Sequence, residues 1–477
     1  MKNFRKNQGI TLIALVITVI VLLILAGITI TTLTGDNGIL NRVQEAKNET
    51  EQAEKDEKEK IGDMEDIINE YTTGIEIEQV TDENPGVLEG TGTEADPYTI
   101  NSIEDLVVFA SNVREGTTYE GQTVKLGLSL DFNSNKSYVD PLRTDYGEYG
   151  YDGELKTLLT TGEGFKPIGT EKDVINDEGT SIISNYCFNG IFDGSGKIIK
   201  NLYMNKKVLN EETSIRVALF GFNGGTITNL GVVDTKIYTN NNIFRPAGIA
   251  GQNNSSGIIQ KCYTSGTIVC SANIAGGIST WSSGTITDCY NSINIQSILE
   301  TDLQDEEIRI GGIASSSSST GTISNCYNIG KIECTTTADT GKFKIGGIVG
   351  MNGNINNCYN MGNIILNAER AQSVYLGGIS GHMDRVSLEN CCNTGILSGK
   401  NDTNLRIGGI VGHRNQGTLT LCYYLKDVAE KGVGYGSDDT ILVEKKLDMP
   451  DIISILGSEF KEDTNNINNG YPILTWQ

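Results

Sequence analysis

Proline, histidine and tryptophan are scarce in this sequence. Its 477 residues include seven prolines, two histidines and two tryptophans, against 57 glycines. Many glycines with few prolines and few aromatic residues are typical of a chain with many tight β turns, and they argue against a packed α/β enzyme. The chain has no His-Glu-x-x-His motif and no Cys-x-x-Cys pair. These absences exclude the motif of the zinc metallopeptidases and leave a cysteine zinc site without support.

Positive charge is also in short supply. The chain has 37 lysine and arginine residues against 60 aspartate and glutamate residues, a formal net charge of -23. Such an excess of negative charge repels nucleic acid and anionic membrane surfaces. We therefore expect no nucleic-acid partner. An acidic exterior suits an extracellular protein, where divalent cations screen it.

The sequence does contain a repeat. Between Ala247 and Leu425 one phrase returns six times: Gly-Gly-Ile or Ala-Gly-Ile, a variable loop, a short apolar run, a cysteine and, in most copies, Tyr-Asn. The cysteines follow one another at steps of 27, 37, 32, 33 and 31 residues. They are Cys262, Cys289, Cys326, Cys358, Cys391 and Cys422.

A period of this length with no helical face predicts stacked β structure. Each unit holds short β-prone runs bounded by Gly, Ser, Asn and Asp, so no unit can bury a core by itself. When the units stack at the strand spacing of about 4.8 Å, each repeated residue lies on its counterpart and the interior becomes continuously apolar. The predicted fold is therefore all-β, a parallel β-helix over 90–441 with its clearest repeats at 218–425.

The six repeated cysteines are expected to form a ladder inside this β-helix. Neighbouring rungs are about 4.8 Å apart, wider than the Cβ–Cβ separation of about 3.8 Å that a disulfide prefers. We therefore interpret these cysteines as small buried hydrophobic residues. An asparagine that follows in four units is expected to stack likewise and to satisfy its amide against its neighbours. These asparagines are Asn291, Asn328, Asn360 and Asn393.

The repeat resembles the GLUG motif of bacterial surface proteins. The resemblance rests on phrases such as Gly346–Gly350 and Ile355–Asn360, and it extends to an opening phrase at Gly90–Ile100 and a closing one at Asn469–Trp476. GLUG repeats are found in adhesins and beside immunoglobulin A-cleaving metallopeptidases. The resemblance implies a β-helix ectodomain on a cell surface and says almost nothing about its ligand.

The N-terminal sequence predicts a membrane anchor. A short basic segment, 1–9, precedes the uncharged segment 10–35. At a rise of about 1.5 Å per residue, a helix over 10–35 is long enough to cross a hydrocarbon core about 30 Å thick. Basic residues precede the span and an acidic stretch follows it, so the positive-inside rule places the rest of the chain outside. We predict a single-pass protein of the cell membrane with an extracellular C-terminal ectodomain, from a Gram-positive bacterium.

The junction around Gly9 and Ile10 resembles the leader of type IV pilin-like proteins. In that family a prepilin peptidase cuts after the glycine and the new N-terminal residue is methylated. The resemblance implies cleavage after Gly9 and methylation of Ile10. The fifth mature position, where the family has a glutamate that helps register the pilin in its filament, is Ala14. This departure argues against a major pilin, whereas membrane insertion requires only the apolar run.

Four further segments complete the predicted organisation. Residues 36–71 are rich in charge and carry apolar residues at helical spacing, which indicates a charged helical stalk, and 72–89 is a linker. A short helix is predicted at Ser102–Val113, with Ser102 as its N-cap, and it is expected to plug the first open end of the β-helix. The tail, 442–477, is expected to cap the other end.

Few residues are candidates for chemistry. His382 and His413 both follow Gly-Gly-Ile-x-Gly, so we expect them on adjacent rungs, where they are weak candidates for a shared metal. No cofactor is otherwise predicted, although an acidic loop offers oxygen ligands of the kind that calcium prefers. The scattered carboxylates considered for calcium or for glycoside chemistry are Asp288, Asp302, Asp305, Glu306, Glu307 and Glu389.

The predicted function is that of an adhesin or recognition module. A rigid solenoid presents a long flank of stacked loops without needing a catalytic cleft. We expect a glycan, a host protein or a matrix protein as ligand and no enzymatic activity. Two alternatives stay open: a minor pilin or pseudopilin, and a β-helix polysaccharide lyase or hydrolase. The loops expected to bind are the longest and least periodic, at 134–162, 206–213, 300–309 and 335–342.

Overall fold

The chain divides into two units, Met1–Glu76 and Ile77–Gln477. The computed structural model describes residues 86–133, 158–160, 162–175, 181–206, 215–299, 306–337, 341–401, 404–443, 456, 458–468 and 470–477. All of these belong to the second unit, so the predicted leader, membrane helix and stalk lie outside the described residues. Within the described ranges, no helix combines the length and apolarity that crossing a bilayer requires.

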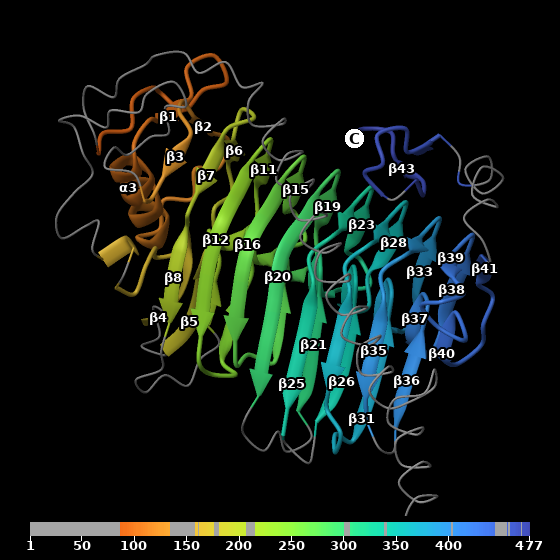
Figure 1. Cartoon of the computed structure of the whole chain (residues 1–477). Coiled ribbons are helices and arrows are strands. Elements are labelled where there is room, and N and C mark those ends of the chain that lie inside the picture. The colour runs from red at the N-terminus through yellow and green to blue at the C-terminus, as the bar shows by residue number, and fades with distance from the viewer. Residues whose placement is uncertain are drawn as a thin grey trace, which may run out of the picture. The chain divides into compact units, whose positions relative to one another are not determined.

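The described chain winds into a parallel β-helix, which confirms the fold predicted for the ectodomain (Figure 1). Successive turns add strands to four walls, here named sheets A, B, C and D. Within these walls each strand pairs in parallel with its counterpart one turn later. Two described strand pairs are antiparallel, β4 (Thr170–Ile175) with β5 (Ser181–Tyr186) and β42 (Phe460–Lys461) with β43 (Ile473–Leu474), besides isolated antiparallel bridges at Thr99 and Met204.

Sheets A and C are built from short strands. Sheet A contains, in spatial order, β1 (Tyr98–Ile100), β2 (Thr123–Leu126), β6 (Ile191–Asp193), β11 (Thr226–Thr228), β15 (Ile258–Gln260), β19 (Thr285–Thr287), β23 (Thr322–Ser324), β28 (Asn354–Asn356), β33 (Val386–Glu389) and β38 (Gly417–Thr420). Sheet C contains β10 (Phe220–Asn223), β14 (Ala250–Asn253), β18 (Ser279–Ser282), β22 (Ala314–Ser317), β27 (Val349–Met351), β32 (Ser380–Met383), β37 (Val411–Arg414) and β40 (Val433–Tyr435).

Sheets B and D complete each turn. Sheet B contains β3 (Leu130–Asp131), β7 (Ile198–Lys200), β8 (Tyr203–Lys206), β12 (Gly231–Thr239), β16 (Tyr263–Cys270), β20 (Tyr290–Leu299), β24 (Tyr327–Asn328), β25 (Ile332–Thr336), β29 (Tyr359–Asn360), β30 (Ile364–Asn367), β34 (Cys392–Asn393), β35 (Leu397–Lys400), β39 (Tyr423–Leu425) and β41 (Ile441–Val443). Sheet D contains β17 (Ile274–Gly276), β21 (Glu307–Gly311), β26 (Lys342–Gly346), β31 (Ser373–Gly377) and β36 (Leu405–Gly408). A parallel bridge from Ala247 to Gly276 continues it to the pair β9 (Ile215–Val217) and β13 (Phe244–Pro246).

The helix α3 (Ile103–Arg114) lies at the N-terminal end of the solenoid (Figure 1). Its capping box confirms Ser102 as the N-cap, because the Ser102 hydroxyl accepts from the Asp105 backbone N–H at 3.1 Å and the Asp105 carboxylate accepts from the Ser102 N–H. The ring of Phe109 packs against Phe188 and Phe192 of the first turns, at centroid distances of 5.6 and 5.7 Å. The helix therefore closes the first end of the apolar interior.

The repeated cysteines line the interior where sheet A passes into sheet B. All six are at most 1% exposed, and all ten cysteines of the chain are free thiols. Each of the six thiols donates to the carbonyl two residues earlier, as Cys326 does to Ser324 at 3.0 Å. The residue before each cysteine adopts a left-handed backbone, which turns the chain at this corner. Asparagine tolerates that conformation well, which explains its frequency there.

The repeated asparagines form a buried ladder beneath the Gly-Gly pairs. Asn291 donates its amide to Asn328, Asn328 to Asn360 and Asn360 to Asn393, each at 2.8 Å. The second glycine of each pair covers one rung, because a Cβ at Gly347 would collide with the side chain of Asn360. The same holds for the Gly277, Gly312 and Gly378 rungs. The glycine pair and the asparagine of the repeat are thus two halves of one packing arrangement.

The tail of the chain lies along the flank of the solenoid. The sequence predicts a cap over the last turn, whereas the described part of the tail packs its Phe460 and Leu474 against stacked tyrosine rings of sheet B. Trp476 lies 5.6 Å from the ring of Tyr327, and Gln477 accepts a hydrogen bond from the Tyr359 hydroxyl at 2.8 Å. The stacked rings therefore give the described part of the tail an apolar surface to cover, and the cap over the last turn stays a prediction.

Removing one rung of the asparagine ladder should destabilise the solenoid. Asn291→Ala removes two buried hydrogen bonds, the one that Asn291 accepts from the Thr264 hydroxyl and the one that it donates to the Asn328 side-chain carbonyl, and each is worth about 0.5–1.5 kcal/mol. Urea unfolding of the full-length protein, followed by circular dichroism, should show a lower midpoint. Gln296→Ala, which removes an exposed amide from the same strand β20, is the matched control and should leave the midpoint nearly unchanged. Equal effects of the two substitutions would contradict the ladder's role.

Candidate functional site

The outer faces of sheets D and C meet along one edge of the solenoid, here named the D–C seam. Each strand of sheet D ends at a Gly-Gly pair, after which the chain turns sharply into sheet C. The last glycine of the phrase Gly-Gly-Ile-x-Gly lies in sheet C and packs on the backbone of a sheet D strand. A Cβ at Gly381 would collide with the N–H of Ile345, and one at Gly412 would crowd Leu376. This close approach brings the outward side chains of the two sheets together.

On the sheet D side of the seam, the outward position two residues before the glycine pair forms a basic ladder. Strand pairing places the residue at this position directly beside its counterpart in the next turn. Five of the seven positions hold a cation, although the whole chain carries a net charge of -23. In spatial order the basic ladder is Arg216, Arg245, Ile274, Arg309, Lys344, Tyr375 and Arg406.

A second ladder, the facing ladder, lines the sheet C side. It contains aromatic residues, two histidines and a methionine, and its members also pair in register from turn to turn. Both predicted metal candidates, His382 and His413, belong to it. In spatial order the facing ladder is Phe222, Gln252, Trp281, Ser316, Met351, His382, His413 and Tyr435.

The two ladders touch across the seam. The Arg216 guanidinium donates to the Gln252 amide oxygen at 2.8 Å and lies 5.1 Å from the Phe222 ring centroid. Lys344 Nζ lies 3.6 Å from the sulfur of Met351. Further along, the ring of Tyr375 packs on that of His413, with centroids 4.7 Å apart. The seam is therefore one surface that combines cations with polarisable rings.

Carboxylates neutralise part of the basic ladder. Glu307 accepts from Lys344 at 2.6 Å and from Arg309 Nε at 3.1 Å. Partial burial acts to raise the pKa of Glu307, but the hydrogen bonds from these two cations lower it to about 2. Glu171 lies 3.5 Å from Arg216. Arg245, between these two neutralised groups, has no carboxylate within salt-bridge distance among the described residues.

The two histidines lie on adjacent strands, as the repeat spacing predicts. Their ring centroids are 4.8 Å apart, in an edge-to-face arrangement. Burial, together with the nearby Lys344 and His413, lowers the pKa of His382 to about 4, so this imidazole is neutral at pH 7. The described residues contain no cluster of three or more His, Cys, Asp or Glu side chains that could hold a metal ion.

The described candidate carboxylates lie on different parts of the solenoid. Asp288 occupies a left-handed corner beside sheet A and accepts from the Asn325 amide at 3.0 Å. Glu389 belongs to β33, three strands further along the same sheet. Glu307 lies on sheet D, and Glu306 accepts from the Asn242 amide at 3.2 Å. Asp302 and Asp305 fall outside the described residues, so the calcium loop stays a prediction.

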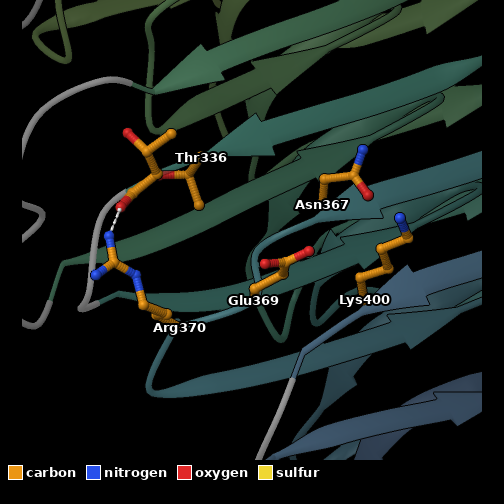
Figure 2. Close-up of a pocket in the computed structure, with 6 residues that line it drawn as sticks. Thr336, Asn367, Glu369, Arg370 and Lys400 are labelled. Carbon is orange, nitrogen blue, oxygen red and sulfur yellow. Dashed lines mark hydrogen bonds between the residues drawn. The ribbon is translucent and has the colours of Figure 1, made fainter. Parts of the chain in front are cut away.

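One predicted binding loop borders a pocket of about 370 Å³ at the ends of β25, β30 and β35. Figure 2 shows its polar lining, in which Arg370 donates to the Thr337 carbonyl at 3.0 Å. Its charges are mixed, since Glu369 lies between the cations Arg370 and Lys400. Of the other predicted loops, residues 134–157, 161, 207–213 and 300–305 lie outside the described residues.

The comparisons with known proteins concern the fold. The chain is similar to a solved structure from Bacteroides ovatus, described as a "putative immunoglobulin A1 protease", with 19% sequence identity and a TM-score of 0.46. The match covers 81% of this chain and 95% of that chain. No protein-family model matches the chain, and no curated protein does.

His382 should make the folding stability of the protein sensitive to mild acid. The unfolded chain binds a proton at His382 near pH 6.5, whereas the folded chain does so only near pH 4. Above pH 6.5 both states are neutral at this site. Stability is therefore lost as the pH falls from about 6.5 to about 4, because the proton favours the unfolded state.

The variant His382→Gln should lose less stability over this interval than the unmodified protein. In an earlier turn of the solenoid, Gln252 occupies the facing-ladder position that His382 holds in its own turn. The solenoid therefore accommodates a glutamine side chain at this position. The measurement is the change in the thermal unfolding midpoint between pH 7 and about pH 4.5, made on the unmodified protein and on the variant. The same shift in both proteins would show that His382 titrates normally in the folded state.

Proposed function

We propose that this protein is a membrane-anchored bacterial cell-surface protein that acts as an adhesin or recognition module, and that its D–C seam binds an extended, acidic ligand. The supporting observation is the basic ladder itself. Like charges on neighbouring strands repel one another, and cations placed directly beside each other destabilise a sheet. An anionic ligand lying along the ladder would relieve that repulsion.

The surrounding charge favours the same conclusion. The rest of the chain is strongly acidic, so an anionic polymer is repelled from most of the surface and is attracted where the cations gather. From Arg216 to Arg406 the ladder spans six strand spacings, about 29 Å at roughly 4.8 Å each. That length fits a polymer of several units better than a single small molecule.

The facing ladder supplies a second kind of contact. Trp281 and Tyr435 expose 37% and 57% of their surface, and such rings give large, rigid contact areas to a ligand. A separate hollow of about 530 Å³ on sheet B places Tyr203 and Tyr238 with ring centroids 6.1 Å apart. Aromatic rings beside amides and hydroxyls are typical of surfaces that bind sugars, which supports a glycan over a folded protein ligand.

The N-terminal sequence supports attachment to the membrane. We include in the proposal a single membrane span at 10–35, an extracellular ectodomain and cleavage by a prepilin peptidase between Gly9 and Ile10. The leader-like junction also favours the second candidate function, a minor pilin or pseudopilin. The proposal contains no enzymatic activity.

Binding should be selective for acidic polymers and sensitive to salt. Acidic glycans, neutral glycans and matrix proteins are immobilised in separate wells, and the full-length protein is added in detergent. Retention of the protein and release of product from the ligand are measured in the same wells. Retention of acidic members should fall as salt rises from about 0.1 M to about 1 M, because the Debye length shrinks from about 10 Å to about 3 Å. Released product, or no retention by any member, would contradict the proposal.

The same assay includes variants that remove charge from chosen places. Arg245→Ile combined with Arg406→Tyr takes two cations from the basic ladder and replaces them with residues that other turns already hold there, Ile274 and Tyr375. Retention should fall several-fold. Lys125→Gln combined with Lys236→Gln removes two cations elsewhere and should change retention little.

Processing of the leader can be measured directly. Mass spectrometry of the membrane-associated protein from its native host should give an N-terminus at Ile10 carrying one methyl group. Gly9→Val should block the cut and leave the N-terminus at Met1. An unprocessed native protein would show that the junction is not a leader.

A further inference from the structure

The first half of the D–C seam holds a pocket of about 210 Å³, here named the arginine pocket. It lies where the basic ladder and the facing ladder come together around the exposed tryptophan. Three guanidinium groups approach one another there without an intervening carboxylate in the lining. Its lining includes Arg216, Arg245, Arg309, Gln252, Thr280 and Trp281.

Arg245 is the central cation of the arginine pocket. Its Nη1 donates to the backbone carbonyls of Asn242 and Phe244, which holds the side chain in place. Its other nitrogens have no hydrogen-bond partner among the described residues. Burial and the repulsion of Arg216 and Arg309 outweigh the attraction of Glu306 and Glu171 and lower the pKa of Arg245 to about 10, so the group still carries its charge at pH 7.

The neighbouring arginines differ from Arg245 because each has a carboxylate partner. Arg216 lies 3.5 Å from Glu171, and Arg309 is held by Glu307. Their charges are therefore largely satisfied inside the protein. Arg245 is left as a fixed, partly desolvated cation that can donate to an anion from outside through a planar guanidinium.

Trp281 places an aromatic face beside this cation. Its indole N–H donates to the Ser283 hydroxyl at 3.0 Å, which fixes the ring, and 37% of the residue is exposed. A fixed aromatic face and a guanidinium in one pocket match a ligand with a flat apolar face and an attached anion. A sugar ring that carries a carboxylate or a sulfate has both features. The side chain of an acidic peptide has the anion but lacks the ring.

We propose that the arginine pocket binds one acidic sugar residue of a polysaccharide, with the sugar ring on Trp281 and the carboxylate or sulfate on Arg245. This inference rests on the proposed binding function of the D–C seam and adds the chemical class of the ligand.

The repeat itself supplies conservative variants. Ile274 holds the ladder position next to Arg245, and Ser316 holds the position next to Trp281. Arg245→Ile and Trp281→Ser therefore introduce side chains that the solenoid accommodates one turn away. An unchanged circular dichroism spectrum shows that each variant folds, and Lys125→Gln, which removes an exposed cation from sheet A, is the matched control.

The experiment is calorimetric titration of the full-length protein with defined probes. Trigalacturonic acid and sulfated maltotriose separate the carboxylate from the sulfate, fully methyl-esterified trigalacturonate provides the same ring without charge, and a triglutamate peptide provides the charge without a ring. At least one of the two acidic sugars should bind at least about tenfold more tightly than the methyl ester does. Arg245→Ile and Trp281→Ser should each weaken that binding about tenfold, and the control should not.

Three outcomes would overturn the inference. The ester could bind as tightly as the acid, both pocket variants could bind normally, or triglutamate could bind best and be unaffected by Trp281→Ser, which would identify an acidic peptide site. The assay on immobilised glycans and matrix proteins separates these failures from failure of the proposed function. Retention there that survives both pocket variants would leave the seam's binding function intact and reject the acidic-sugar pocket, whereas loss of all retention would reject both.

Discussion

In the solenoid, Asn291, Asn328 and Asn360 each donate the side-chain amide to the asparagine of the next turn, and each lies beneath a glycine that leaves no room for a side chain. An amide in an apolar interior is tolerated only where its hydrogen bonds are made, so each turn must stack on the last without slipping by a residue. A slip of one residue would move Asn328 out of line with Asn360 and turn the interior side chains of the strand outward. The loops between turns vary in length because this constraint acts on the strands alone.

The strand register that the interior packing fixes also aligns the side chains on the outer surface. From Asn291 to Asn393 the asparagine rungs hold successive turns in line. Parallel pairing on sheet B extends the alignment to the earlier turns, where Val232 and Thr264 take the asparagine position, so the outward position on sheet D is also held in line. The basic ladder is a consequence of that alignment, although Arg216 and Arg406 are 190 residues apart in the sequence. The glycine pair acts twice, since it makes room for the asparagine inside and brings sheets D and C together outside. Interior packing and the candidate binding surface therefore have a common cause.

The structure uses stacked aromatic rings in two different ways. On sheet B, Tyr263, Tyr290, Tyr327 and Tyr359 stack face to face at 4.9–5.0 Å, and the tail covers the later members of the row. On the D–C seam, the rings of Trp281 and Tyr435 stay exposed to solvent. The first arrangement buries apolar surface between parts of the same chain. The second leaves a fixed ring beside a guanidinium that has no carboxylate partner among the described residues, and this pairing is the basis of the proposed binding site.

The sequence by itself determined the architecture. The phrase around Gly347, Cys358 and Asn360 recurs often enough to predict a parallel β-helix and adjacent histidines, and local capping chemistry predicts the helix after Ser102. The D–C seam could not be predicted in the same way. Its residues differ in kind from turn to turn, from Arg309 to Tyr375, so no motif marks them. The path of the tail likewise depended on which apolar surface was left uncovered. Repetition reveals which residues stack, whereas only the folded chain decides which stacks face each other, because that depends on how sharply the backbone turns between sheets.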